Sequence, residues 1–177
     1  MTRLIYPALY LLATVLANLA FARIMNDPSL DKYLLLADFM ICFIFIGVDM
    51  GLRDRLHQSW EGHGLAYKMG LLILTGSLLS YAINNEAEVV ARASFVAFLA
   101  AGVSDALVFQ ALKGRSALIR ANGSNIPSAI VDSLTFPLMA FGWPLQWAFF
   151  SVELAAKLLG GALWAWIFFR WRSSSLR

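Results

Sequence analysis

Six stretches of mostly apolar residues follow one another along this chain, each long enough to cross a lipid bilayer. A spanning helix needs about 20 such residues to cross roughly 30 Å of hydrocarbon. The stretches are continuous rather than alternating, and a spanning backbone must satisfy its own hydrogen bonds, so helices are favoured over strands. The sequence therefore predicts an all-α integral membrane protein, one six-helix transmembrane bundle over residues 1–177, with spans at 4–22, 33–52, 65–84, 89–112, 125–141 and 145–170.

The composition agrees with a membrane location. Of 177 residues, 60% are hydrophobic and 14% are charged, and the mean hydropathy is +0.68. A soluble domain of this size could not bury so much apolar surface in its own core. The net charge of +3 resides mainly in short connections, which indicates membrane orientation rather than a nucleic-acid partner. The single cysteine, Cys42, excludes a disulfide framework.

The basic residues also predict the orientation of the bundle. Six spans place both termini on one side, together with the second and fourth connections. That side carries ten lysines and arginines against three on the other, so the positive-inside rule predicts cytoplasmic termini and a multi-pass protein of the cell inner (plasma) membrane. The ten are Arg3, Arg53, Arg55, Lys68, Lys113, Arg115, Arg120, Arg170, Arg172 and Arg177, and the three are Arg23, Lys32 and Arg92.

The first stretch has one competing interpretation. Arg3 precedes it and a small-residue segment, 20–22, ends it, as in a cleaved signal peptide. The stretch is long for such a peptide, and Pro7 and Asn18 interrupt it. We therefore expect a membrane span.

Ionisable and amide side chains occur inside the apolar stretches. A charge in hydrocarbon costs at least about 2.5 kcal/mol, so such residues usually face a bundle interior and mark a pathway or a binding site. Helical spacing aligns Asn125, Ser128, Asp132 and Thr135 on one face of the fifth stretch, and Gln146, Glu153, Lys157 and Gly160 on one face of the sixth. Stripes converging from several helices predict a polar cavity. The candidate substrate-binding residues are Asn18, Asp105, Asn125, Asp132, Glu153 and Lys157.

Structural roles compete with binding at several of these positions. Hydroxyls such as those of Ser94 and Ser128 commonly join neighbouring helices. Glu153 and Lys157 lie four residues apart, so they can pair with each other for structural reasons alone. Asp132, like Asp105, has no base one turn away in its own helix. These two acids are protonated, find a cation across the bundle, or bind a ligand, and we favour binding.

Other polar residues are expected to be peripheral. Asp38, Asp49 and Arg92 lie nearer the span ends, where snorkelling to the interface is favoured. Arg53 belongs to an ordinary cytoplasmic anchor, residues 53–55. His57, like His63, is expected to be a loop histidine. Neither shows metal-ligand spacing, and we expect no metal site and no cofactor.

Several segments together resemble one known family. Residues 91–98, Ser104-Asp105, Ser124-Asn125, Asp132-Ser133, Phe136 and 140–142 are similar to the fourth and fifth helices of the vitamin uptake transporter (VUT) family, read as queuosine precursor transporters. Leu52-Arg53-Asp54 with His57 resembles the family's turn after the second helix, and Lys157 its last-helix lysine. The similarity covers roughly positions 14 to 160. The residues before Lys157, 149–153, depart from the family pattern.

The resemblance implies a six-helix fold similar to the substrate-binding component of energy-coupling-factor vitamin transporters. It also implies uptake of 7-cyano-7-deazaguanine or its aminomethyl relative. A guanine-like edge offers two adjacent N–H donors and one acceptor. Asp132 or Glu153 can accept from the donors, and Asn125 or Lys157 can donate to the acceptor. The candidate stacking rings are Phe95, Phe136 and Phe149.

Three other readings remain open at this level. The first is a transporter of similar fold for another vitamin or nucleobase, because related heterocycles demand similar pockets. The second is a membrane-embedded enzyme, which the lone mid-span cysteine and the absence of zinc spacing disfavour; we expect no enzyme. The third is a structural helper or channel. The chain has no phosphate-binding Walker motif, so an external coupling module, a homo-oligomer or downhill flux all remain open.

Overall fold

The computed structural model describes residues 2–60 and 64–174, and within these ranges the chain is helical with no strand. The predicted all-α class is therefore confirmed for the described residues. His63 and Arg177, both considered above, lie outside them. The elements are α1 (Thr2–Met25), η1 (Pro28–Tyr33), α2 (Leu34–Ile41), η2 (Cys42–Ile46), α3 (Gly47–Trp60), α4 (Leu65–Ile83), η3 (Asn85–Ala87), α5 (Glu88–Ala111), α6 (Ala117–Phe141) and α7 (Trp147–Ser174).

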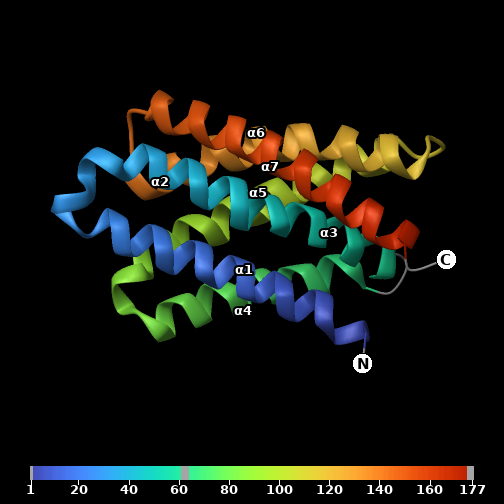
Figure 1. Ribbon diagram of the computed structural model, residues 1–177, viewed down its shortest axis with the longest axis horizontal. Helices are drawn as coiled ribbons and strands as arrows, with labels where there is room; N and C mark the ends of the chain where they lie inside the picture. Colours follow the sequence, from blue (N-terminus) through green and yellow to red (C-terminus); the bar gives the residue numbers. More distant parts are fainter. Residues whose placement is uncertain (1, 61–63, 175–177) are drawn as a thin grey trace.

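The long helices lie lengthwise beside one another in a single bundle (Figure 1). The start of α1, the end of α3, the start of α4 and the end of α7 lie at one end, with the α5–α6 connection; we call this the terminal end. The two short 3₁₀ elements, η1 and η3, and the α6–α7 connection lie at the opposite end. In a bilayer, these two ends of the bundle would therefore lie on opposite sides.

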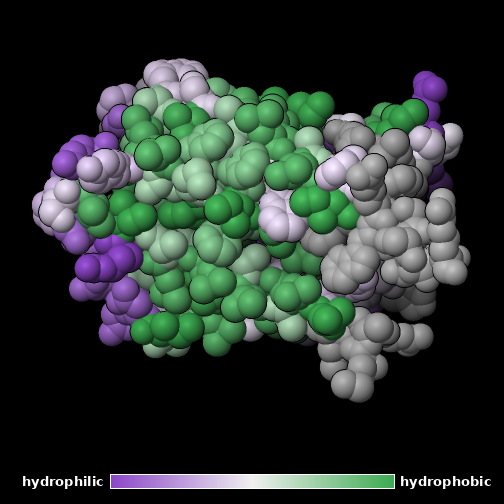
Figure 2. All heavy atoms as spheres, in the orientation of Figure 1, coloured by the Kyte–Doolittle hydropathy of each residue, from purple (hydrophilic) through white to green (hydrophobic). Residues whose placement is uncertain are grey.

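Three helical segments are long and apolar enough to cross a membrane among the residues that the structure describes: Ile5–Met25, Pro28–His57 and Asn85–Ala111. A shorter apolar helix covers Tyr67–Ile83. On the face seen in Figure 2, a broad apolar band covers the middle of the bundle, and hydrophilic residues gather at the end that holds η1. This distribution is that of a membrane protein.

Two helices extend beyond the apolar stretches. The second stretch forms one continuous rod, α2–η2–α3, in which Cys42–Ile46 is a π-helical turn, and it ends at Trp60 rather than near residue 52. The extra turns are polar in composition, but Arg53 and His57 are buried, so low hydropathy marks an inward face rather than a helix end. α6 begins near residue 117 rather than 125, where the Ser116 hydroxyl caps it by accepting from the Ile119 amide.

Small residues bring the helices into close contact. Ala93, Ala97 and Ala101 are buried along α5, which makes its most extensive contact with α6. α7 crosses the π-helical turn so closely that a Cβ on Gly160 would collide with the Phe43 backbone. Such crossings depend on small side chains, because in lipid helices associate mainly through close packing.

The surface polar groups at the η1 end behave as ordinary helix caps and exposed pairs. The Ser29 hydroxyl and amide both donate to Asp27 Oδ1, and these hydrogen bonds lower the pKa of the Asp27 carboxyl below its usual value. Arg92 lies 3.3 Å from Glu88, with both side chains mostly exposed. Arg92 is thus peripheral, as predicted.

Candidate functional site

A buried polar cavity lies between α1, α2, η2, α5, α6 and α7, and we call it the chamber. Four of the six predicted binding residues line it: Asn18, Asp132, Glu153 and Lys157. They come from three helices, the first of the chain (α1) and its last two (α6 and α7). The remaining lining residues are Ala17, Phe21, Asp38, Ile41, Cys42, Ile46, Val90, Ser94, Phe98 and Phe136.

Lys157 is the cationic centre of the chamber. Its Nζ lies 3.0 Å from Asp132 Oδ2 and donates to Glu153 Oε2 one turn earlier in α7. The side chains of Lys157 and Glu153 are at most 3% exposed. Asp132 therefore finds its cation across the bundle, and the predicted Glu153–Lys157 pair is confirmed. Ion pairs buried to this degree are stable only when both partners are present.

Three carboxylate oxygens in the chamber have no hydrogen-bond partner among the described residues: Asp38 Oδ2, Asp132 Oδ1 and Glu153 Oε1. Buried acceptors of this kind are rare, since each one loses its hydration without compensation. The chamber thus holds three carboxyl groups against the single ammonium of Lys157. A ligand rich in N–H donors, or carrying a positive charge, complements this arrangement.

Asn18 occupies the wall of the chamber as part of a hydrogen-bond network. Its amide nitrogen donates to Ser80 Oγ over 3.0 Å, and its carbonyl oxygen accepts from Ser94 Oγ over 2.6 Å. Ser80 in turn donates to the backbone oxygen of Gly76. The network joins α1, α4 and α5, so Asn18 and Ser94 hold helices together, as proposed for the serine.

Aromatic rings close the chamber toward the end of the bundle that holds η1. The Phe21 and Phe136 rings both line it and meet edge to face, with centroids 5.4 Å apart. Phe141 lies against Phe21 and also against Phe149. Of the predicted stacking rings, Phe136 is in the chamber. Phe149 packs behind it, and Phe95 lines a separate groove near Arg92.

The chamber is narrow in this conformation. Its volume is about 30 Å³, which suffices for a water molecule or two. The predicted polar cavity is therefore present, but in this conformation it is too small for a flat heterocycle. Binding of a ring requires the surrounding helices to move apart.

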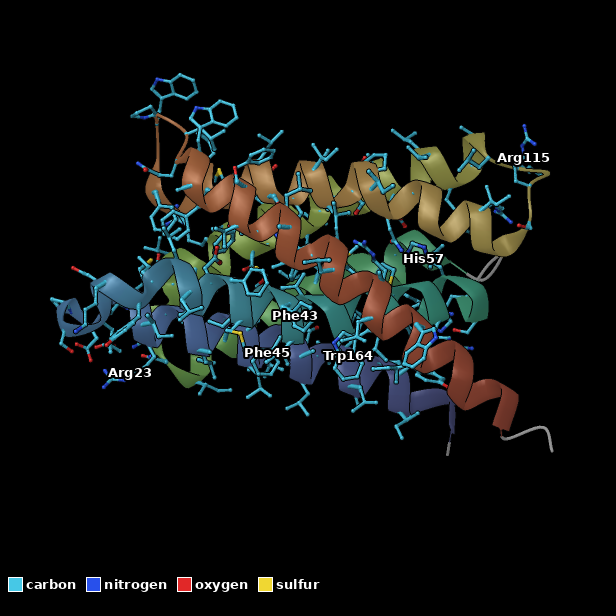
Figure 3. The ribbon with its side chains drawn as sticks, turned by 45° about the horizontal axis from the view of Figure 1, so that its top comes forward. Arg23, Phe43, Phe45, His57, Arg115 and Trp164 are labelled. Atoms are coloured by element: carbon cyan, nitrogen blue, oxygen red, sulfur yellow. The ribbon has the colours of Figure 1, made fainter. Side chains whose placement is uncertain are left out.

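Two predicted binding residues lie elsewhere. Asp105 is fully buried in the terminal half of α5, where its Oδ2 lies 3.2 Å from His57 Nδ1. Asn125 is half-buried in α6 and does not line the chamber. The expectation that His57 is a loop histidine is wrong: it lies inside α3 and faces the interior, as Figure 3 shows. Asp105 thus takes an across-bundle partner.

Three residues expected at the membrane interface are buried instead. Asp38 and Asp49 are 1% and 2% exposed, and Arg53 is 6% exposed. Arg53 donates to Ser128 over 3.0 Å, and Thr14 donates to Asp49 over 3.3 Å. The sequence contained a signal for the two acids, since Asp38, Cys42 and Asp49 follow helical spacing. Helical spacing was thus a better guide to the burial of these acids than their position near a span end.

Metal-ligand groups are not assembled in the part of the chain that the structure describes. No three side chains among His, Cys, Asp and Glu come together there in a way that could hold an ion.

A bundle of apolar helices around a chamber of buried ionisable groups is typical of membrane proteins that handle small polar molecules. The family model described as "Putative vitamin uptake transporter" matches residues 2–171. The chain belongs to this transporter family, which confirms the resemblance found in the sequence. No curated protein and no solved structure matches the chain.

Proposed function

We propose that this protein imports a queuosine precursor, 7-cyano-7-deazaguanine or 7-aminomethyl-7-deazaguanine, across the cell inner membrane. The observation that carries the proposal is the set of three unpartnered carboxylate oxygens around Lys157, all buried in one chamber. Membership in the "Putative vitamin uptake transporter" family supports uptake of a small molecule as the general activity. The finer claim concerns the cargo.

The edge of a deazaguanine complements these groups. Its ring N–H and exocyclic amine are adjacent donors, which a carboxylate such as Asp132 or Glu153 accepts in a bidentate pair. Its carbonyl oxygen accepts from an ammonium, a role that fits Lys157. Phe21 and Phe136 supply aromatic surface beside the polar groups, and stacking on such rings stabilises a bound base by about 1–3 kcal/mol.

The charge of the chamber favours the aminomethyl form. The chamber is lined by the three carboxyl groups of Asp38, Asp132 and Glu153 and by the single ammonium group of Lys157. A primary amine on the ligand is protonated at neutral pH, and its positive charge compensates an excess carboxylate in a poorly solvated site. The nitrile of the cyano form offers no such charge.

For the transport path we propose six spans with both termini in the cytoplasm. The location of the start of α1 and the end of α7 at the same end of the bundle supports an even number of crossings (Figure 1). In Figure 3, Arg23 and Arg115 lie at opposite ends of the bundle, and the basic residues Lys113 and Arg115 belong to the terminal end. The positive-inside rule then makes the terminal end cytoplasmic. Substrate enters from the η1 end, and the chamber widens to admit it.

Queuosine in transfer RNA gives a direct test. In a host that cannot make the precursor, expression of this protein with external precursor is expected to restore queuosine in tRNA. Asp132→Asn removes one charge-assisted acceptor and is expected to abolish restoration, whereas Arg92→Ala, at the exposed periphery, retains it. A well-expressed protein that restores nothing would overturn the proposal.

Another cargo is the competing outcome. The purified protein is tested by thermal shift against the two deazaguanines, guanine, adenine and a set of water-soluble vitamins. Stabilisation by a deazaguanine alone supports the proposed cargo. Stabilisation by one of the vitamins and by no deazaguanine would keep the family's general activity and replace the substrate.

A further inference from the structure

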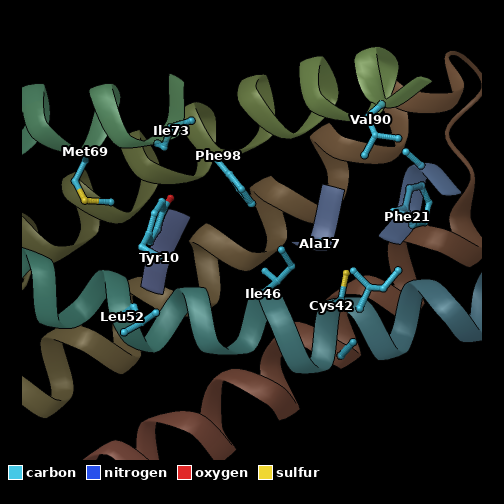
Figure 4. Close-up of a cluster of buried hydrophobic side chains, with 14 of the residues drawn as sticks. Tyr10, Ala17, Phe21, Cys42, Ile46, Leu52, Met69, Ile73, Val90 and Phe98 are labelled. Carbon is cyan, nitrogen blue, oxygen red and sulfur yellow. The ribbon is translucent and has the colours of Figure 1, made fainter. Parts of the chain in front are cut away.

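One aromatic side chain borders three separate cavities of the bundle. Phe98, midway along α5 and 6% exposed, lines the chamber, a void of about 10 Å³ beside Asp49 and Arg53, and a large cavity of about 500 Å³. Figure 4 shows Phe98 between Tyr10 and Ile73 on one side and Cys42 and Val90 on the other. Its ring thus lies where the chamber ends and the large cavity begins.

The large cavity, which we call the vestibule, extends from Phe98 toward the terminal end. It follows α5 as far as Gln110, which corresponds to about 18 Å along a helix, and it reaches Lys113 in the α5–α6 connection. Its volume is in the range of small-molecule sites. Its walls are mostly apolar, and its polar groups are Arg53, His57, Gln110, Lys113 and Arg120, with the hydroxyl of Tyr10.

The charges of the two cavities are opposite in kind. The chamber carries an excess of carboxyl groups, whereas basic side chains and no acid line the vestibule among the residues that the structure describes. A donor-rich or cationic heterocycle is therefore held more strongly in the chamber than in the vestibule. Along a path from the chamber to the vestibule, the cargo is first bound tightly in the chamber. It is then released from the vestibule, which binds it more weakly.

The helix around Phe98 leaves room for its ring to move. One turn toward the terminal end lies Gly102, where an added Cβ would meet nothing within 4 Å. A helical phenylalanine has two common χ1 rotamers, which exchange without displacement of the backbone. Exchange of the Phe98 ring between these rotamers would connect chamber and vestibule.

We propose that the vestibule is the release half of the substrate path and that Phe98 is the gate between it and the chamber. The cargo class is the flat heterocycle of the proposed function, on which this inference rests. The gate itself, however, is a property of the two cavities, so that it can be tested without any substrate.

Cys42 serves as a built-in reporter. It is the only cysteine of the chain, it is 5% exposed, and it lines the chamber but not the vestibule. Thiol labelling depends on access to the sulfur. We therefore measure, by intact-mass spectrometry, the rate at which p-chloromercuribenzenesulfonate modifies Cys42 in the purified full-length protein, with Cys42→Ser as the blank.

Phe98→Ala is expected to raise the labelling rate by about tenfold or more, because it opens the chamber to the vestibule. Phe109→Ala removes the same ring from the vestibule wall alone and is expected to leave the rate near that of the wild type. Gly102→Trp, added to Phe98→Ala, fills the vestibule and lowers the rate again. Phe98→Leu is a milder change that replaces Phe98→Ala in the experiment if the alanine variant does not fold. It is expected to give a labelling rate between those of the wild type and a fully opened gate.

Unchanged labelling in both Phe98 variants would overturn the gate. So would equal acceleration by Phe136→Ala, which enlarges only the chamber and would indicate entry from the opposite end. The tRNA assay separates the two proposals. Restoration of queuosine with no effect of Phe98 on labelling removes the gate alone, and faster labelling without restoration by the wild type removes the cargo alone.

Discussion

The chamber and the vestibule meet at Phe98, yet they differ in volume by more than a factor of ten, about 30 Å³ against about 500 Å³. The chamber carries an excess of carboxyl groups, and the vestibule has mostly apolar walls with basic side chains among them. A buried ion is stable only with partners in direct contact, so the chamber contracts around Lys157. Apolar walls impose no such demand, and the helices around the vestibule stay further apart. The ion pairs of Lys157 therefore hold the helices together at the chamber, whereas small residues permit the other close crossings of the bundle.

The largest expected effect is at Lys157. Lys157→Met leaves Asp132 and Glu153 buried without their cation, which costs about 3–5 kcal/mol when one partner of a buried pair is removed. Lys113→Met, at the exposed end of the vestibule, is the matched control and should have little effect. Denaturant unfolding of both variants in detergent measures the difference. Equal stabilities would mean that the chamber is not held together by its ion pairs.

The next effect concerns packing. Gly160→Ala places a Cβ against the Phe43 backbone, an overpacking change that typically costs about 1–3 kcal/mol. Gly102→Ala meets open space beside the vestibule and, as a helical glycine replacement, is expected to be neutral or stabilising by up to about 1 kcal/mol. Melting temperatures of the two variants test this. A loss at Gly102 as large as at Gly160 would show that the two halves are packed alike.

Ligand preference sharpens the electrostatic side of the comparison. The aminomethyl precursor is expected to bind about tenfold more tightly than the cyano form, a difference of roughly 1.4 kcal/mol. Asp38→Asn removes one chamber carboxylate and should narrow the ratio. Asp105→Asn removes a carboxylate that faces His57 in the terminal half of the bundle, and this variant should leave the affinity ratio unchanged. Calorimetric titration measures both, and an unchanged ratio in Asp38→Asn would argue against the charge excess.

The smallest effect is expected outside both cavities. Arg92→Ala breaks an exposed pair with Glu88, and such pairs contribute within about 1 kcal/mol. Its melting temperature should match that of the wild type. If it falls as far as in Gly160→Ala, the periphery of α5 contributes more than its exposure indicates.

Much of this arrangement could be predicted from local patterns. The spacing of Asp132 in α6 and of Glu153 and Lys157 in α7 placed these side chains on inward faces, and the structure brings them together in one chamber. Asp38, Arg53 and His57 were misplaced. Hydropathy treats a polar residue near a span end as interfacial, but a helix can continue with its polar face turned inward.

The partners across the bundle could not be predicted. Asp105 has no base one turn away in its own helix, and His57 reaches it from α3, far away in the sequence. Asn125 shares the stripe of Asp132 but lies about two turns away along α6, outside the chamber. Periodicity identifies a face, but it does not say which part of that face meets which neighbour.

Helical class, the apolar stretches and the inward faces follow from the order of residues alone, because backbone hydrogen bonds and transfer into lipid are local properties of each segment. The contraction around Lys157, the pairing of His57 with Asp105 and the position of Phe98 between two cavities arise only when the helices pack. Those features depend on the distances and crossing angles between segments far apart in the chain, which close packing determines jointly for all of them.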